Sequence, residues 1–282
     1  MTDDDVRTLA TGFGLVEAPR WHGDRLYFSD WNAHDVIVLT PDGGTEVFAH
    51  VDSFPLCTDW SPDGRLLLVS TGDALLLRRE HDGGLTTHAD LKAVAPGGWN
   101  DIVVDGRGNA YVDNVAEAFT GGAPDAGLVA LVTPDGTVRQ VADGLSFPNG
   151  MAVTQDNGTL IVAESYASRL TAFDIAADGS LSGRRVWAAL DGAAPDGICV
   201  DAEDAVWYAD VPNRCCVRVA EGGRVLRTVA LDRGGFACAL GGPDRRTLFV
   251  TAAEWGGASV MVPPGTGRLL SVPVEVPGAG WP

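Results

Sequence analysis

A unit of 40 to 50 residues recurs six times along the chain, and this repeat constrains the fold more than any other feature of the sequence. Each unit contains a loop, a short apolar run, a turn and two or three more short runs. The runs are rich in β-branched and aromatic residues, and the turns are of one kind, as in PDGG, SPDG, TPDG and QDNG. No segment keeps a helical apolar period over ten or more residues, so the runs are predicted to be strands.

The spacing of the units predicts the architecture. Aligned on one position at the start of the first run, the units lie 40, 43, 49, 47 and 41 residues apart. Four strands in such a length form one propeller blade, so the sequence predicts an all-β, six-bladed β-propeller with four-stranded blades. An irregular spacing would have favoured a β-sandwich. No linker divides the chain, which predicts a single domain over 1–282, with VRTLATG near the N-terminus supplying an outer strand to the last blade.

The aligned positions carry chemistry. In a propeller the innermost strand of each blade begins beside the central channel, so we call these residues the mouth positions: Glu17, Cys57, Asn100, Asn149, Asp196 and Ala237. Four of the six offer hard oxygen donors, which favour Ca²⁺ and also suit Mg²⁺ or Mn²⁺, whereas a Zn²⁺ site more usually brings His or Cys. The competing interpretation is that Asn-Gly and Asp-Gly are common turn dipeptides, for which no ligand is needed.

Composition limits the partners. Thirty-eight Asp and Glu against 20 Lys and Arg give a net charge of -18, which argues against nucleic acid or an anionic membrane as partner and leaves a small molecule. The first residues, MTDDDVRTLA, hold no apolar stretch typical of a signal peptide. Five cysteines without a CxxC pair favour free thiols in a reducing, cytoplasmic compartment. The oligomeric state is left open.

Four motifs then resemble one known family over nearly the whole chain. They are GLVEAPRW with Glu17, WNDIVVDGRG with Asn100, FPNGMAV with Asn149, and APDGICVDAEDAVW with Asp196. The chain resembles the SMP-30/gluconolactonase/luciferin-regenerating-enzyme family of six-bladed propellers. The resemblance implies a divalent metal held by Glu17, Asn149 and Asp196, with Asn100 contacting the substrate or completing the metal shell. It also implies lactone hydrolysis, although some relatives act on organophosphates.

The chain departs from the family pattern at two places. Gly98 stands where sugar-lactone members carry an arginine, and Ala118 stands where they carry a glutamate, although Glu117 is adjacent. Trp99 brings a large ring nearby. We therefore expect Trp99 and Glu117 to contact the substrate together with Asn100, and the substrate to be less polar than a sugar lactone. The alternative is that Trp99 packs between blades.

Lactone hydrolysis needs an activated water and stabilisation of an oxyanion, and one divalent cation can supply both. Asp196 is the first candidate for the general base, because a ligating carboxylate can accept a proton through its free oxygen; Asp101 and Glu117 are alternatives. The sequence has no GxSxG, HExxH, GxxxxGK[ST] or helix-opening GxGxxG motif. Two other functions stay open: a non-catalytic binding propeller, and a metal-dependent enzyme of other chemistry, such as organophosphate hydrolysis or a step in secondary metabolism.

Overall fold

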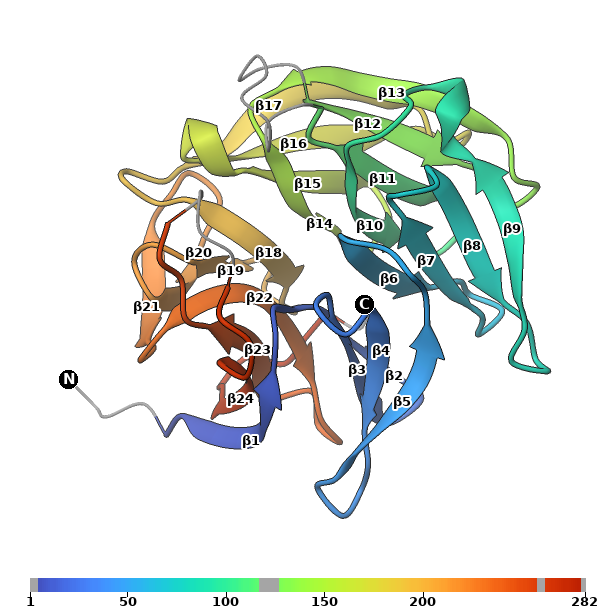
Figure 1. The fold of residues 1–282 in the computed structure, drawn as a ribbon. Coiled ribbons are helices and arrows are strands. Elements are labelled where there is room, and N and C mark those ends of the chain that lie inside the picture. Colours follow the sequence, from blue (N-terminus) through green and yellow to red (C-terminus); the bar gives the residue numbers. More distant parts are fainter. Residues whose placement is uncertain (1–4, 117–126, 258–261, 280–282) are drawn as a thin grey trace.

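The computed structural model describes residues 5–116, 127–257 and 262–279, and over these ranges it confirms the propeller. The chain forms six four-stranded antiparallel sheets that follow one another around a ring (Figure 1). We number these sheets as blades 1 to 6 in the order in which their innermost strands occur. Two short 3₁₀ turns, η1 (Leu91–Ala93) and η3 (Ser165–Ala167), are the helical segments among the described residues.

The strands of each blade, from the innermost outward, have the following bounds. Blades 1 to 3 are built from β2 (Val16–His22), β3 (Arg25–Asp30), β4 (Asp35–Leu39) and β5 (Thr45–His50); β6 (Leu56–Trp60), β7 (Leu66–Ser70), β8 (Leu75–Arg79) and β9 (Leu85–Asp90); and β10 (Trp99–Val104), β11 (Ala110–Asn114), β12 (Gly127–Val132) and β13 (Val138–Leu145). Blades 4 to 6 are built from β14 (Pro148–Val153), β15 (Thr159–Glu164), β16 (Arg169–Ile175) and β17 (Leu181–Ala189); β18 (Pro195–Val200), β19 (Val206–Asp210), β20 (Cys215–Val219) and β21 (Val225–Ala230); and β22 (Gly234–Gly241), β23 (Thr247–Ala253), β24 (Gly267–Pro273) and β1 (Arg7–Phe13).

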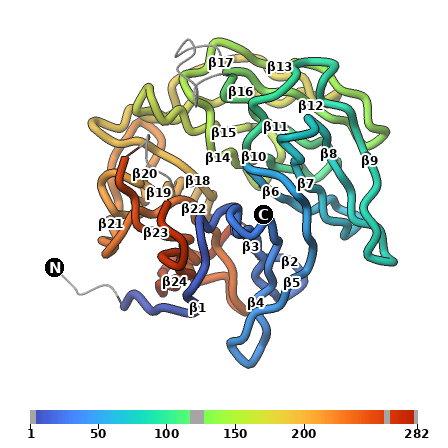
Figure 2. The backbone as a smooth tube through the Cα atoms, in the orientation of Figure 1, coloured from blue at the N-terminus to red at the C-terminus, as the bar shows by residue number. Residues whose placement is uncertain are grey.

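The ring is closed by the first strand of the chain. β1 pairs antiparallel with β24 on the outside of blade 6, as the sequence predicts, so the two ends of the chain share one sheet. Figure 2 shows β1, in blue, beside β24, in red. Each innermost strand also contacts the innermost strands of the two neighbouring blades, and together they surround the central axis.

Apolar side chains fill the space between adjacent blades. The inner strands are buried on both faces because each sheet is packed between two others, and β7 (LLLVS) and β10 are buried at every residue, whereas outermost strands such as β5 and β9 are largely exposed. All five cysteines are free, and four of them are buried, including the three predicted to lie in the core, Cys57, Cys199 and Cys238. No helix of the described residues is long and apolar enough to cross a membrane.

The two ends of the ring differ. We call the end at which the innermost strands begin the mouth end, and the other the back end. Tight turns such as Thr40–Gly44 join strands at the back end, where backbone hydrogen bonds close them. Residues 277–279 also pack there, between blades 5 and 6, where the amide of Ala279 donates to the carbonyl of Val200 at 3.2 Å.

Candidate active site

The mouth positions begin the innermost strands, as the repeat predicts. Glu17, Asn100, Asn149 and Asp196 are each the second residue of their strand, in β2, β10, β14 and β18 respectively. Cys57 has the same place in β6, whereas Ala237 is the fourth residue of β22. Five of six blades therefore present an equivalent position at one end of the channel.

A β-bulge shapes the strand at each oxygen-bearing position. In β10, β14 and β18, two successive residues oppose one residue of the next strand, and the mouth residue is the first of the two. In β2 the register shifts directly after Glu17. β6, which carries Cys57, pairs with β7 without a shift. β22, which carries Ala237, also shifts register, between Gly235 and Ala237, so bulges are not confined to the oxygen-bearing strands. Bulges redirect side chains and are frequent next to active sites, and all four oxygen-bearing positions have one at or directly after them.

The glycine after the ligand is explained by close packing. A β-carbon on Gly150 would lie 2.4 Å from the carbonyl oxygen of Asp196, and one on Gly197 would lie 2.2 Å from the β-carbon of Ala237. Neighbouring innermost strands thus approach so closely that only glycine fits. Asn149-Gly150 and Asp196-Gly197 consequently lie within strands, and the turn interpretation of these dipeptides does not apply to them.

Hydrogen bonds join the amide side chains across blades 3, 4 and 5. The Nδ2 atom of Asn100 donates to Oδ1 of Asn149 at 3.3 Å, and Nδ2 of Asn149 donates to Oγ of Ser165, also at 3.3 Å. Ser165 in turn donates to the carbonyl of Pro195 at 2.7 Å, one residue before Asp196. Ser165 thus links the Asn149 side chain to β18, a contact that the repeat alone does not reveal because Ser165 follows the second strand of its blade rather than beginning the first.

The two carboxylates of the site lie in an electrostatically strained environment. Burial raises the pKa of Glu17 to about 8, even though its Oε2 accepts a hydrogen bond from the amide of Ala18 at 2.9 Å. Burial also raises the pKa of Asp196 well above its ordinary value, and the negative charge of Glu17 raises it further. Two carboxylates that oppose each other's ionisation favour either a shared proton or a bound cation.

The donor set fits a hard divalent cation. Two carboxylates and an amide oxygen are the ligands that Ca²⁺ takes in proteins. No side-chain hydrogen bond reaches Asp196 from the described residues, so its carboxylate oxygens are not committed to another group. Within the described ranges, no three His, Cys, Asp or Glu side chains gather in a group that could hold a metal. The predicted ligand set contains only two residues of these four types, Glu17 and Asp196, and its remaining ligand is the amide of Asn149. It therefore differs from a group of three such side chains.

The remaining predicted residues are placed differently. Trp99 is fully buried, and its indole donates to the carbonyl of Ala95 at 3.1 Å, which favours the packing alternative over contact with a substrate. Glu117 lies outside the described residues. Gly98 has φ +83, and a β-carbon there would lie 2.6 Å from the carbonyl oxygen of Ala116. The backbone itself thus excludes a side chain at the position where the family resemblance led us to compare Gly98 with an arginine.

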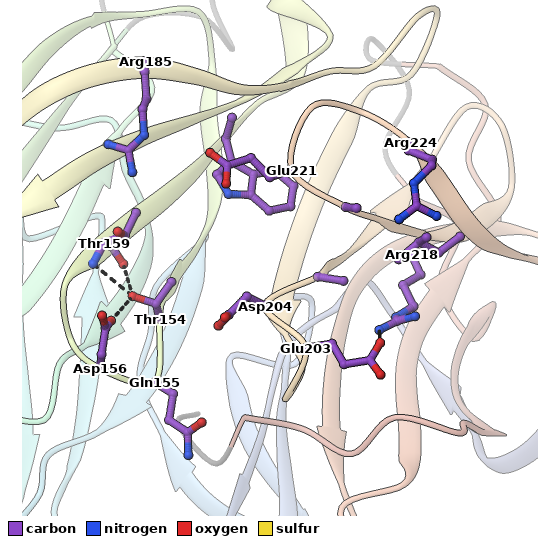
Figure 3. A pocket seen from close by; sticks show the side chains of 14 residues that line it. Thr154, Gln155, Asp156, Thr159, Arg185, Glu203, Asp204, Arg218, Glu221 and Arg224 are labelled. Carbon is purple, nitrogen blue, oxygen red and sulfur yellow. Dashed lines mark hydrogen bonds and ion pairs between the residues drawn. The ribbon is translucent and has the colours of Figure 1, made fainter.

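A separate pocket of about 930 Å³ lies at the back end between blades 4 and 5. Its side chains come from turns such as Thr154–Thr159 and from strands of blade 5 (Figure 3). One of its arginines is paired with a carboxylate of the same lining: Arg218 donates to Glu203 at 2.8 Å. None of the mouth positions lines it, so this pocket and the candidate site are at opposite ends of the propeller.

Known proteins place the chain in the family that the motifs resemble. The family described as "SMP-30/Gluconolactonase/LRE-like region" matches residues 15–254, and the chain therefore belongs to it. Pentonolactonase XacC of Haloferax volcanii is 30% identical over 260 residues, which are 89% of this chain and 86% of that protein. Regucalcin of Xenopus laevis is 28% identical over 195 residues, or 66% of this chain and 65% of that one. A solved luciferin-regenerating enzyme shares the fold, with a TM-score of 0.83 at 21% identity over 98% of this chain and 97% of its own.

Proposed function

We propose that this protein is a divalent-cation-dependent lactonase that opens a small lactone ring by attack of water at the mouth of the channel. The observation that supports it most is the electrostatic coupling of two mouth carboxylates, the buried Glu17 of blade 1 and the half-buried Asp196 of blade 5: the negative charge of Glu17 raises the pKa of Asp196, and no protein hydrogen bond reaches the Asp196 side chain from the described residues. The sequence similarity to a pentonolactonase supports lactone hydrolysis as the class of reaction. Kinship to regucalcins, one of which is named a calcium-binding protein, supports a cation.

Glu17, Asn149 and Asp196 would hold the cation, which is Ca²⁺ by preference of the hard donors, with Mn²⁺, Mg²⁺ or Zn²⁺ as alternatives. When bound, such a cation polarises a carbonyl oxygen and lowers the pKa of a coordinated water. The hydrogen bonds from Asn100 and to Ser165 fix the plane of the Asn149 amide, so that its oxygen keeps one lone pair for a ligand.

Asp196 is the proposed general base. Its uncommitted carboxylate can take the proton of the attacking water while the other oxygen holds the cation. Asn100 lies beside Asn149 at the mouth, and its amide group is suited to contact the lactone. Glu117, outside the described residues, keeps its predicted role in substrate binding, and Asp101 is less suited to be the base because its carboxylate accepts from the amide of Ile102 at 2.8 Å.

The substrate is proposed to be a lactone less polar than a sugar lactone. The relative's name points to a pentonolactone, whereas Gly98 has no room for the arginine side chain that the family resemblance implies in sugar-lactone members. A panel decides between them: glucono-δ-lactone and a pentono-γ-lactone on one side, and alkyl-substituted γ- and δ-lactones on the other. We expect higher kcat/KM for the alkyl-substituted lactones.

The test uses purified full-length protein, assayed on this panel before and after treatment with a chelator. The proposal predicts that the chelator abolishes hydrolysis and that Ca²⁺ or Mn²⁺ restores it. Asp196→Asn should stay inactive at every cation concentration, and Asp156→Asn, at the back end, is the matched control that should keep wild-type activity. Hydrolysis unaffected by the chelator would contradict the proposed dependence on a cation. Cation binding without lactone turnover would move the search to organophosphates, and neither property would leave a binding propeller.

A further inference from the structure

Among the innermost strands of the described residues, β2 alone carries an arginine, and it lies beneath the mouth. Arg20 follows Glu17 by three residues on β2, and its side chain is only 8% exposed. Its Nη2 atom donates to the carbonyl of Ile102 at 2.8 Å and lies 3.5 Å from Oδ1 of Asp101. Its Nε atom is 3.4 Å from Oδ1 of Asp59, within ion-pair distance although the N–H is not aligned for a hydrogen bond.

These contacts join the innermost strands of three consecutive blades. Arg20 belongs to β2, Asp59 to β6, and Asp101 with Ile102 to β10. Asp59 is itself held by two amides, from Val104 at 2.7 Å and from Trp60 at 2.8 Å. The guanidinium therefore has fixed partners on both sides rather than mobile surface carboxylates.

The partner on β10 is part of the bulge that presents a mouth residue. Asn100 and Asp101 are the two bulged residues, opposite Asp113 on β11. The amide of Asp101 donates to Oδ1 of Asp113 at 2.5 Å, and the carboxylate of Asp101 faces Arg20. In β14 and β18 the second bulged residue is glycine, which close packing holds in place. In β10 the second bulged residue is instead held by the ion pair between Arg20 and Asp101.

We infer that Arg20 is a positioning residue for the cation site: by holding the Asn100–Asp101 bulge against β2 and β6, it sets Asn100 where its amide meets Asn149. This inference rests on the proposed function. Arginine suits the task because its planar fork can address several oxygens in fixed directions, which the single ammonium of lysine cannot do. A merely stabilising role is a weaker explanation, since buried ion pairs contribute little stability beyond an apolar replacement.

The sign of the effect separates positioning from simple electrostatics. A guanidinium near a cation site repels the cation, so its removal should tighten binding if charge alone matters. If Arg20 positions Asn100, its removal should weaken binding instead. The double variant Arg20→Met/Asp59→Asn removes one positive and one negative charge together, which keeps the net charge constant and leaves no uncompensated Asp59 to unfold the protein.

The experiment measures Ca²⁺ and Mn²⁺ binding to full-length variants by isothermal titration calorimetry, with lactone kinetics in parallel. We expect the dissociation constant to rise at least about tenfold in Arg20→Met/Asp59→Asn, as for other residues that support metal ligands, and to rise by an intermediate amount in Arg20→Lys. The matched control is Arg218→Met/Asp201→Asn, which removes a comparable pair (2.6 Å) outside the channel and should leave the dissociation constant within about twofold of wild type.

Unchanged or tighter cation binding in a folded Arg20→Met/Asp59→Asn protein would overturn the inference while leaving the proposed function intact. Wild-type protein that binds neither cation would overturn the proposed function and the inference together. Circular dichroism and Tm of each variant establish that it is folded. If the double variant does not fold, the Arg20→Lys variant decides the question. A wild-type dissociation constant for the cation in that variant would contradict positioning by the planar guanidinium group.

Discussion

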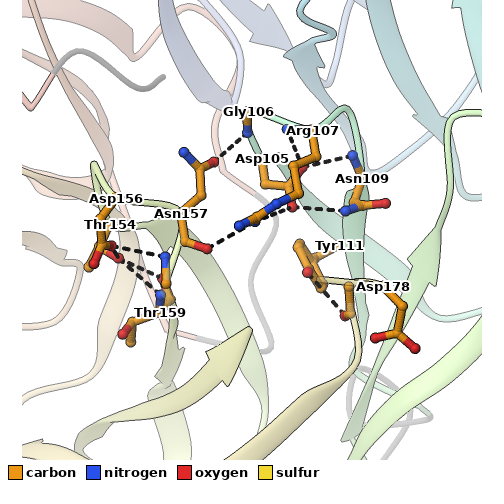
Figure 4. A network of polar contacts seen from close by, with 12 residues as sticks. Asp105, Gly106, Arg107, Asn109, Tyr111, Thr154, Asp156, Asn157, Thr159 and Asp178 are labelled. Carbon is orange, nitrogen blue, oxygen red and sulfur yellow. Dashed lines mark hydrogen bonds and ion pairs between the residues drawn. The ribbon is translucent and has the colours of Figure 1, made fainter. Parts of the chain in front are cut away.

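The dipeptide Asn-Gly occurs twice within ten residues of blade 4, and the two copies have different structural roles. Asn149-Gly150 lies in a bulge of β14 at the mouth end, whereas Asn157-Gly158 lies in the tight turn at the back end. Asn157 has φ 57, and its Oδ1 accepts from the amide of Gly106 in blade 3 at 2.5 Å (Figure 4). Asn149 instead bonds only to other side chains among the contacts found for it.

The carboxylates at the two ends differ in the same way. In the back-end turn, Thr154 donates to Asp156 at 2.7 Å, and this hydroxyl, with the amide of Gly158, lowers the pKa of Asp156. At the mouth, burial raises the pKa of Asp196. The back-end carboxylate of Asp156 is thus satisfied by groups two residues away and stabilises its turn, while the mouth carboxylates favour a shared proton or a bound cation.

The largest expected effect comes from exchanging one carboxylate for an amide at each end. Asp196→Asn should lower kcat/KM for the best lactone by about a thousandfold, because it removes both the base and a charged ligand. Asp156→Asn should change kcat/KM by less than about twofold. Steady-state kinetics at saturating Ca²⁺ measure both. Equal losses in the two variants would contradict the division between the ends.

Glycine substitutions sharpen the comparison through stability. Gly197→Ala places a methyl group 2.2 Å from the β-carbon of Ala237 and should lower the free energy of unfolding by about 3 kcal/mol. Gly64, in a back-end turn, has φ +79 and open space around it, so Gly64→Ala should cost only about 1 kcal/mol. Urea denaturation of both variants tests the order. A larger loss at Gly64 would show that strand approach at the channel is looser than described.

The pH dependence of stability should also distinguish the ends. The folded-state pKa of Glu17, about 8, lies above its ordinary value of 4.5, so the protonated carboxyl stabilises cation-free protein below pH 4.5. This stabilisation is lost as the pH rises through about 8. Tm measured in chelator should therefore fall with rising pH in wild type more steeply than in Glu17→Gln. Parallel curves would contradict the raised pKa, and added Ca²⁺ should reduce the difference.

The smallest effect is expected at an exposed back-end carboxylate. Hydrogen bonds from Arg78 and Thr86 lower the pKa of Glu80 to about 2. Because this pKa is depressed, its contribution to stability is present above pH 4.5 and is lost as the pH falls toward 2. Glu80→Gln should lower Tm slightly at neutral pH, and the difference from wild type should vanish in acid. A difference that grows on acidification would be contrary to this sign.

Sequence predicted the fold because the repeat encodes it locally: each unit contains its own strands and turns, and even the ring-closing β1 was predictable as the strand missing from the last blade. It also predicted which residues begin the innermost strands. It did not predict Ser165 or Arg20, whose roles depend on contacts between blades, such as that between Arg20 and Ile102. Trp99 shows the same limit, since its position beside Asn100 did not reveal that its ring is buried.

The most direct measurement is a crystal structure of the protein grown with Mn²⁺, read from the anomalous difference density. The account predicts one strong peak at the mouth end, within coordination distance of Glu17, Asn149 and Asp196, with Asn100 beside it. A map without a peak at the mouth, or with its strongest peak among the back-end turns around Asp156 or Asp204, would contradict the central claim.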